Sequence, residues 1–329
     1  MKSTVTLLVT GVLTLFCSFS LILYVQYVSA AEEPSKMRSP EELLQALTAE
    51  IKQGTSADHE ILIKEIVAHG QDALPAISNS IKKGDKSVNA ILLNVLSQIP
   101  SESSNRLLIR FASDPSDGEL RRMALGKLEN RRIEFPLSKS EFDVLSGVIE
   151  TDNILLSGAA ARLLGKCTKN DVADRIQPIL RRFKKEVNTP SDISTIAGSY
   201  LSPRAYILNQ FLLSFSYLGE AALPALQEAS QTSRDKNLNK WLKLARGYAG
   251  DESVTQEIRD IFDKEEDKSI KCLAIRSYAR SAKKSGIPFL SSLLADKTVS
   301  DYGDCTKDIG MPIYIFRNVA KDEMQMLQE

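Results

Sequence analysis

Residues 104–130 read SNRLLIRFASDPSDGELRRMALGKLEN, and this stretch decides the predicted fold. Apolar residues recur at helical spacing in its second half, namely Leu120, Met123, Ala124 and Leu128. Apolar side chains spaced three and four residues apart lie on one side of an amphipathic helix. The stretch therefore predicts a helix near residues 120–130 that buries one side.

The same apolar pattern returns along the chain. Offsets 0, 3, 4, 7, 8 and 11 are apolar in two further stretches. These are Val88, Ile91, Leu92, Val95, Leu96 and Ile99, and then Leu156, Ala159, Ala160, Leu163, Leu164 and Cys167. A fourth stretch begins the pattern with Ile270, Leu273, Ala274 and Tyr278. Small residues in these patterns allow helices to approach closely, so the sequence predicts helices that pack on one another.

A Gly-Pro segment is also repeated. Residues 70–77 read GQDALPAI and residues 219–226 read GEAALPAL, with five of eight positions identical. A weaker third copy, SGIPFL, occupies residues 285–290. In each copy we expect the glycine to end one helix, where a left-handed conformation is needed. We expect the proline to lie in the first turn of the next helix.

These features together resemble the HEAT repeat. HEAT repeats commonly carry an Asp-Pro turn between two helices, followed by an Arg and an Ala-Leu-Gly run on the second helix. The matching residues in 104–130 are Asp114, Pro115, Arg121, Ala124, Leu125 and Gly126. Residues 152–167 and 267–280 match less fully, because both lack the proline. The resemblance implies an all-α protein, a right-handed superhelical α-solenoid of about seven to eight HEAT-like hairpins.

The chain divides into three predicted regions. Residues 1–31 are a signal peptide or N-terminal membrane anchor, residues 32–39 a linker, and residues 40–329 the HEAT-repeat α-solenoid. The predicted repeats are 40–69, 70–100, 103–132, 139–168, 171–218, 219–249, 252–282 and 285–328. The fifth repeat contains an insert at 188–203, NTPSDISTIAGSYLSP, which is longer than the usual connection between helices.

The N-terminal segment predicts export. Lys2 precedes a long apolar stretch, and Val28 and Ala30 fit the small-residue rule for signal peptidase. The apolar stretch is also long enough to span a bilayer, so an uncleaved anchor is the alternative. Both alternatives keep Lys2 inside and place the body outside the cytoplasm. We expect a periplasmic, secreted or membrane-anchored protein that contacts the membrane only through this segment if it is not cleaved.

The overall charge argues against nucleic-acid binding. The chain has 329 residues, with 42 Lys and Arg against 42 Asp and Glu. A general binder of polyanions needs a surplus of cations to displace counterions. We therefore expect a protein or peptide partner and no nucleic acid.

Few residues suggest chemistry. His59 and His69 lie ten residues apart, which is not the spacing of a zinc site on a helix, and no nucleophile motif is present. Cys272 and Cys305 lie in neighbouring repeats and could pair in an oxidising compartment. Cys167 lies on an apolar stripe and is predicted to be buried. We expect no catalytic residue, no metal and no cofactor.

The partner-binding residues are predicted on the second helix of each repeat, which lines the concave face of a HEAT array. These helices are expected near 88–99, 120–130, 155–166, 205–216, 238–247 and 269–280. The candidates are Arg121, Arg122, Arg162, Trp241 and Arg276. Arg121 is also predicted to pair with Asp114 or a neighbouring turn, a structural role in HEAT proteins. Core packing is the alternative for Trp241, because Leu238, Leu242 and Ala245 share its side of the helix.

The leading functional hypothesis is a non-enzymatic scaffold that binds a protein or peptide along its concave face. One alternative is a HEAT-type lyase or hydrolase that uses the 188–203 insert. Another is a membrane-tethered spacer or assembly factor. A deep pocket with convergent carboxylates would favour the enzyme.

Overall fold

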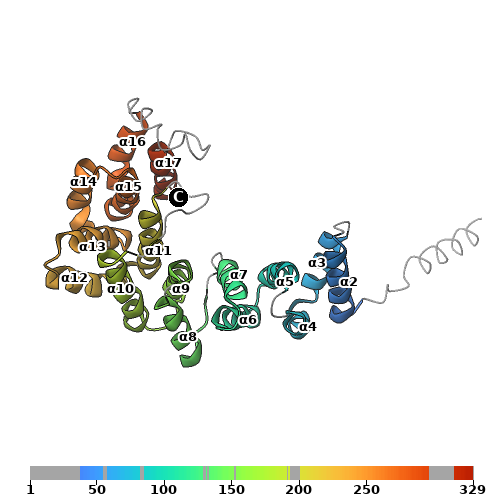
Figure 1. The fold of residues 1–329 in the computed structure, drawn as a ribbon. Helices are drawn as coiled ribbons and strands as arrows, with labels where there is room; N and C mark the ends of the chain where they lie inside the picture. Colours follow the sequence, from blue (N-terminus) through green and yellow to red (C-terminus); the bar gives the residue numbers. More distant parts are fainter. Residues whose placement is uncertain are drawn as a thin grey trace, which may run out of the picture. The chain divides into compact units, whose positions relative to one another are not determined.

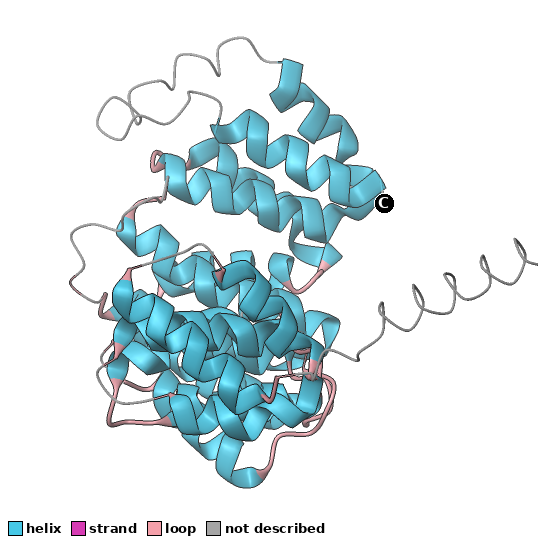
Figure 2. Ribbon diagram, turned by 90° about the vertical axis from the view of Figure 1, so that its right-hand side faces the viewer, coloured by secondary structure: helices cyan, strands magenta, loops and turns pink. Residues whose placement is uncertain are grey.

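The computed structural model describes residues 38–54, 58–81, 85–128, 131, 133–151, 153–190, 192, 201–295 and 315–328. This part of the chain is all-helical, as predicted, and contains no β-strand (Figure 2). A single β-bridge joins Ile133 to Cys167. The N-terminal region 1–31, most of the 188–203 insert and Cys305 lie outside the described residues.

The described residues form two compact units, which divide between Ala76 and Ile77. In the first unit α2 (Pro40–Gln53) packs on α3 (His59–Ala68) through Leu43, Leu47 and Ile66. A capping box begins α2, because Ser39 and Glu42 each accept a hydrogen bond from the other's backbone N–H. The short helix η1 (Gly70–Ala73) follows α3, and α4 (Leu74–Ser80) crosses the boundary between the units.

The second unit continues as paired helices (Figure 1). The first helices of the pairs are α6 (Glu102–Ser113), α8 (Lys139–Ile149), α10 (Val172–Asn188), α12 (Leu223–Thr232), α14 (Thr255–Lys264) and α16 (Ile287–Ala295). Their partners are α7 (Gly118–Leu128), α9 (Ile154–Lys166), α11 (Pro203–Leu218), α13 (Lys236–Tyr248), α15 (Lys268–Ala282) and α17 (Ile315–Gln328). Each of these first helices packs on its partner, and α5 (Lys86–Gln98) precedes the series. We call α5 and these partners the second helices.

Consecutive second helices also pack side by side. Contacts run from α5 to α7, then to α9, α11, α13, α15 and α17 in order. The helices α9 and α11 approach closely, because an added Cβ at Gly165 would lie 2.7 Å from the Ser214 carbonyl oxygen. The small residues predicted in these helices therefore serve close packing.

Short polar residues begin most second helices. Asp85, Asp117, Asn153, Asp235 and Asp267 each accept a hydrogen bond from a backbone N–H in the first turn of α5, α7, α9, α13 and α15. Such caps satisfy donors that the helix itself leaves unpaired. They explain why the apolar patterns begin where they do.

The Gly-Pro prediction holds at two of its three copies. Gly70 and Gly219 have φ angles of 59° and 62°, and each is followed by a 3-10 turn and then by a helix that carries the proline in its first turn. In the third copy the positive φ, 51°, belongs to Lys283 and not to Gly286. The repeated segment therefore begins at Lys283, three residues before the glycine that the sequence suggested.

Arg131 ties the end of α5 to the start of α6. Its guanidinium donates hydrogen bonds to the carbonyls of Ser97 and Ile99, at 2.6 and 2.7 Å, and to Ser104 Oγ at 3.1 Å. Burial lowers the pKa of Arg131 from its ordinary value. This arginine satisfies carbonyls that α5 leaves unpaired, so it is part of the packing between helices.

Candidate functional site

The predicted Asp114–Arg121 turn has a different hydrogen-bond arrangement from the one expected. Asp114 lies between α6 and α7, and its Oδ1 accepts a hydrogen bond from the backbone N–H of Ser116 at 2.8 Å. Asp117 caps α7. The Nε atom of Arg121 is buried without a hydrogen-bond partner. The Asp-Pro turn is therefore present between the helices, whereas an ion pair between Arg121 and Asp114 is not among the contacts that the described residues make.

Trp241 is a core residue and not a surface anchor. Its side chain is 1% exposed, together with buried Leu238, Leu242 and Ala245 on the same side of α13. An indole this deeply buried cannot contact a partner without unfolding of the helix. The prediction that Trp241 binds a partner is therefore wrong, and the alternative of core packing is confirmed.

The predicted arginines lie on second helices in three different settings. Arg122 is exposed on α7 and forms an ion pair with Glu119 at 2.6 Å. Arg162 is half-buried on α9. Arg276 on α15 lies 3.8 Å from Glu323 of α17, which is buried. Of these residues, Arg122 is the most accessible to a partner.

The cysteines and histidines of the described part have structural positions. Cys272 is buried in α15, and its predicted partner Cys305 lies outside the described residues. Cys167 is fully buried as predicted, and burial raises the pKa of its thiol to about 12. His59 begins α3, and His69 ends it with Nε2 3.0 Å from the Arg38 carbonyl oxygen. None of these residues is set up as a nucleophile or base.

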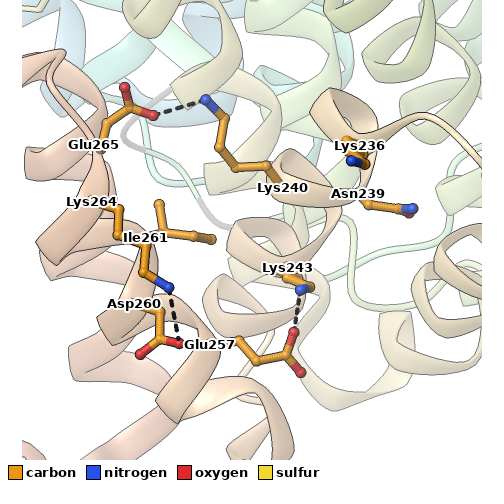
Figure 3. Close-up of a pocket in the computed structure, with 9 residues that line it drawn as sticks. All are labelled: Lys236, Asn239, Lys240, Lys243, Glu257, Asp260, Ile261, Lys264 and Glu265. Carbon is orange, nitrogen blue, oxygen red and sulfur yellow. Dashed lines mark hydrogen bonds and ion pairs between the residues drawn. The ribbon is translucent and has the colours of Figure 1, made fainter.

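A charged groove between α13 and α14 is the candidate site that the structure adds (Figure 3). It has a volume of about 540 Å³ and opens to solvent. Three lysines of α13, four residues of α14, Asn239 and Glu265 form its walls, and Ile261 is the single apolar side chain among them. The full set is Lys236, Asn239, Lys240, Lys243, Glu257, Asp260, Ile261, Lys264 and Glu265.

Ion pairs cross this groove. Lys240 Nζ lies 2.8 Å from Glu265 Oε2, and Lys243 pairs with Glu257 (Figure 3). Lys264 is 3.8 Å from Asp260 within α14. The cations of α13 are therefore largely matched by carboxylates of the next hairpin, and these pairs help to hold α13 against α14.

The carboxylate of Glu265 is held in its ionised form. Burial acts to raise its pKa, but the hydrogen bond from Lys240 and those from the backbone N–H groups of Asp267 and Glu266 outweigh that effect. The pKa of Glu265 consequently lies below its ordinary value. A carboxylate with a lowered pKa is a poor proton donor or acceptor near neutral pH.

The groove suits polar recognition better than catalysis. Ligand pockets for small molecules are usually lined by apolar side chains, and this groove is lined by charges. Asn239 adds a buried Oδ1 without a hydrogen-bond partner, while its Nδ2 donates to the Ser233 carbonyl. The groove can hold an extended polar segment, with Lys236 and Asn239 as its remaining polar contacts.

Sequence reasoning missed this groove although its signal was present. Lys236, Lys240 and Lys243 follow i, i+4, i+7 spacing, and the next helix carries Glu257 and Asp260 at i, i+3 spacing. Each spacing puts like charges on one side of a helix. Only the packing of α13 on α14 shows that the two sides face each other.

The described residues contain no group of three or more His, Cys, Asp or Glu side chains placed to hold a metal ion. In the same part of the chain, none of the helices has the length and apolar character needed to cross a bilayer.

Comparisons with known proteins add no relatives. No protein-family model matches the sequence, and no curated protein matches it.

Proposed function

We propose that the chain is a non-enzymatic binding scaffold, a right-handed α-solenoid of about seven to eight HEAT-like hairpins that holds a protein or peptide on its concave face. The observation that carries this proposal is the order of helix packing in the second unit. Each first helix packs on its own partner, and second helices pack on one another in chain order. A layer of this kind offers a continuous surface made by many repeats.

The exposed side of the second helices supports a binding role. Leu155 on α9 and Tyr217 on α11 are each 44% exposed. Aromatic and aliphatic side chains at exposed positions are frequent contacts in protein interfaces. Together with exposed Arg122, they give this side both apolar and charged contacts.

The electrostatics of the candidate groove favour binding over chemistry. The pKa of Glu265 is lowered, because the burial that would raise it is outweighed by hydrogen bonds from Lys240 and from backbone N–H groups. The pKa of Asp251, which lies outside the groove, is lowered in the same way by hydrogen bonds from Ser253 and Arg246. A catalytic acid or base needs a pKa near the working pH. These carboxylates instead stabilise the packing of neighbouring helices.

Export completes the proposal. The long apolar segment within residues 1–31 would place the body outside the cytoplasm, either released after cleavage or tethered. Mass spectrometry of the mature N-terminus separates these two forms, because a chain that begins at Met1 retains the anchor and one that begins near Glu32 has lost it.

Site-specific photo-crosslinking in the native cell tests the binding face. A photoreactive residue would replace exposed Ala90 or half-buried Ala159 or Ser216 on second helices, with exposed Ser140 and Gln177 on first helices as controls. The proposal expects one defined crosslinked protein from the second-helix positions and little from α8 and α10. Equal crosslinking from both sets, or none from the second helices, would contradict it.

A further inference from the structure

The second helices from α5 to α15 carry almost only positive charge. These six helices contain fifteen Lys and Arg residues but one acidic residue, Glu119, whereas the last second helix, α17, has two cations and two acids. The first helices α6, α8, α10, α12 and α14 are balanced, with ten cations and nine acids. A chain of zero net charge thus separates its charges between the two layers of its second unit.

Acidic caps reduce this asymmetry but do not remove it. Asp85, Asp117, Asp235 and Asp267 lie at the N-terminal edges of α5, α7, α13 and α15. Each carboxylate accepts backbone N–H groups at the positive end of a helix dipole, so part of its charge is already offset. With the caps included, the cations of the six helices from α5 to α15 still outnumber the acids by fifteen to five.

Part of this positive charge is matched within the protein. On α13 three cations are matched by carboxylates, as Lys240 pairs with Glu265, Lys243 with Glu257 and Arg246 with Asp251. On α15 Arg276 faces Glu323, and Arg280 lies over the Tyr248 ring. On α5 and α7, Lys86 and Arg122 both act on the carboxylate of Glu119.

Contacts between neighbouring helices bring cations of α5, α7 and α9 next to the adjacent second helix. Lys86 of α5 acts on Glu119 of α7, and Lys127 of α7 donates to Asn94 of α5 at 2.9 Å. Lys166 of α9 lies 4.7 Å from the centre of the Tyr217 ring of α11. Arg162 precedes Lys166 by one helical turn and Leu155 precedes Arg162 by two, so all three share one side of α9. We call the surface that carries Lys86, Lys127, Arg162, Lys166, Leu155 and Tyr217 the basic face.

We propose that the basic face binds an acidic polypeptide segment that also carries apolar side chains. This inference rests on the proposed scaffold function and names the class of partner that the same face takes. Carboxylates of the partner would meet the lysine and arginine side chains, and its apolar residues would contact Leu155 and Tyr217. Complementary charge of this kind speeds association and selects the partner.

A peptide fits this face better than a nucleic acid. Double-stranded DNA carries one charge per about 1.7 Å, so its binding requires dense rows of cations. The cations here are spread over three helices, α5, α7 and α9, and are interspersed with Leu155, Tyr217 and Asn94. Acidic residues of the first helices and caps would also repel a long polyanion, whereas a short segment can stay on the basic face.

Fluorescence anisotropy tests the proposal on the full-length protein as the cell produces it, with its N-terminal segment either cleaved or retained. The probes are labelled peptides of about 12 residues, which in extended form span four helices at usual packing distances. One peptide combines Glu and Leu, a second Gln and Leu, a third Lys and Leu, and a fourth Glu and Ser. We expect the Glu-Leu peptide to bind at least about tenfold more tightly than each of the others, and its affinity to fall with added salt.

Two charge-reversed variants localise the binding. The face variant combines Lys127→Glu with Lys166→Glu, and the control combines Lys139→Glu on α8 with Lys185→Glu on α10, for the same change in net charge. We expect the face variant to bind the Glu-Leu peptide at least about tenfold more weakly and the control to change less than about twofold. Circular dichroism checks that both variants keep their helices.

Three results would overturn the proposal. Equal losses in the two variants would mean binding by general attraction, and no preference for the acidic peptide would mean that charge does not select the partner. Tighter binding of a single-stranded oligonucleotide, lost in the face variant, would assign the face to nucleic acid. If second-helix positions still crosslink to a protein while the acidic peptide fails to bind, the scaffold function stands and only the acidic class of partner is wrong.

Discussion

Gly126 and Gly165 occupy the same Leu-Gly-Lys sequence in two second helices, yet their surroundings differ. An added Cβ at Gly165 would lie 2.7 Å from the Ser214 carbonyl oxygen and 3.1 Å from the Ser214 Cα, both backbone atoms of α11. An added Cβ at Gly126 would meet nothing within 4 Å. We expect Gly165→Ala to lower the free energy of unfolding by about 1–3 kcal/mol through overpacking. We expect Gly126→Ala to raise it by about 0.5–1 kcal/mol through helix propensity.

Urea unfolding followed by circular dichroism measures both variants. Changes of opposite sign in the free energy of unfolding would support the close approach of α9 and α11. A stabilising effect of both substitutions would mean that the two helices are farther apart than described.

Lys283 is strained where two other repeats have glycine. Its φ of 51° and ψ of −139° resemble the 62° and −150° of Gly219, in a region that side chains disfavour. Replacement by glycine removes this strain and loses exposed ion pairs to Glu252 and Glu220, which contribute little. We expect Lys283→Gly to raise the thermal midpoint, by the equivalent of about 1 kcal/mol. Lys283→Ala, which keeps the strain and loses the same ion pairs, should not raise it.

The conformation and burial of individual residues were the hardest features to predict from the sequence. Aligning the third Gly-Pro copy on Gly286 gave a misplaced turn, because the residue with positive φ there is a lysine. Trp241 could be assigned to the surface or to the core from periodicity alone, since the apolar side of α13 is nearly as wide as its exposed side. Its burial follows from the packing of neighbouring helices, which no single helix reveals.

At the scale of the element, helices were the most predictable feature. The apolar offsets placed second helices near 88–99, 120–130 and 155–166, and the structure has α5, α7 and α9 at these places. Caps explain the differences of one or two residues at the helix starts. Side chains that join one helix to another, such as Arg131 at the end of α5, could not be predicted because their partners lie about 30 residues away.

Glu323 makes the docking of α17 sensitive to pH. Its carboxyl is buried against α15, and burial raises its pKa although Arg280 and Arg276 of α15 act in the opposite direction and Asp322 adds to the rise. A group with a raised pKa in the folded state stabilises the fold below its ordinary value of 4.5, and this contribution is lost as the pH rises through the folded value. We therefore expect Glu323→Gln to gain stability relative to the wild type as the pH rises above about 4.5.

Chemical unfolding of both proteins across this pH range measures the difference. The attraction of Arg280 and Arg276 acts on the ionised carboxylate and is already part of the raised pKa of Glu323, so it does not reverse the trend. Glu265→Gln is the control of opposite sign. The lowered pKa of Glu265 stabilises the wild-type fold above about pH 4.5, and this contribution is lost as the pH falls. The stability of Glu265→Gln relative to the wild type should therefore decrease as the pH rises. The same trend in both variants would contradict the assignment of Glu323.

At the scale of the whole molecule, net charge hides how the charges are distributed. The balance of 42 cations and 42 acids argues against a general binder of polyanions, but it averages over two layers of different charge. The division into layers could be read only once the helices were paired, because first and second helices alternate along the chain. Periodicity predicted the helices, and their packing was needed to sort their charges.

The proposed repeat architecture also predicts how stability is distributed. In a stack where each hairpin contacts only its neighbours, stability is a sum of local terms. Leu47 of α2 and Leu212 of α11 are both fully buried, and replacement by alanine should cost about 2–5 kcal/mol at each place. Leu47→Ala should speed amide hydrogen exchange in α2 and α3 and leave α9, α11 and α13 unchanged. Leu212→Ala should speed exchange in α9, α11 and α13. Native-state hydrogen exchange measured by mass spectrometry separates the two patterns. If the exchange rate in α13 rises equally in both variants, the chain unfolds as one cooperative core and not as a stack of hairpins.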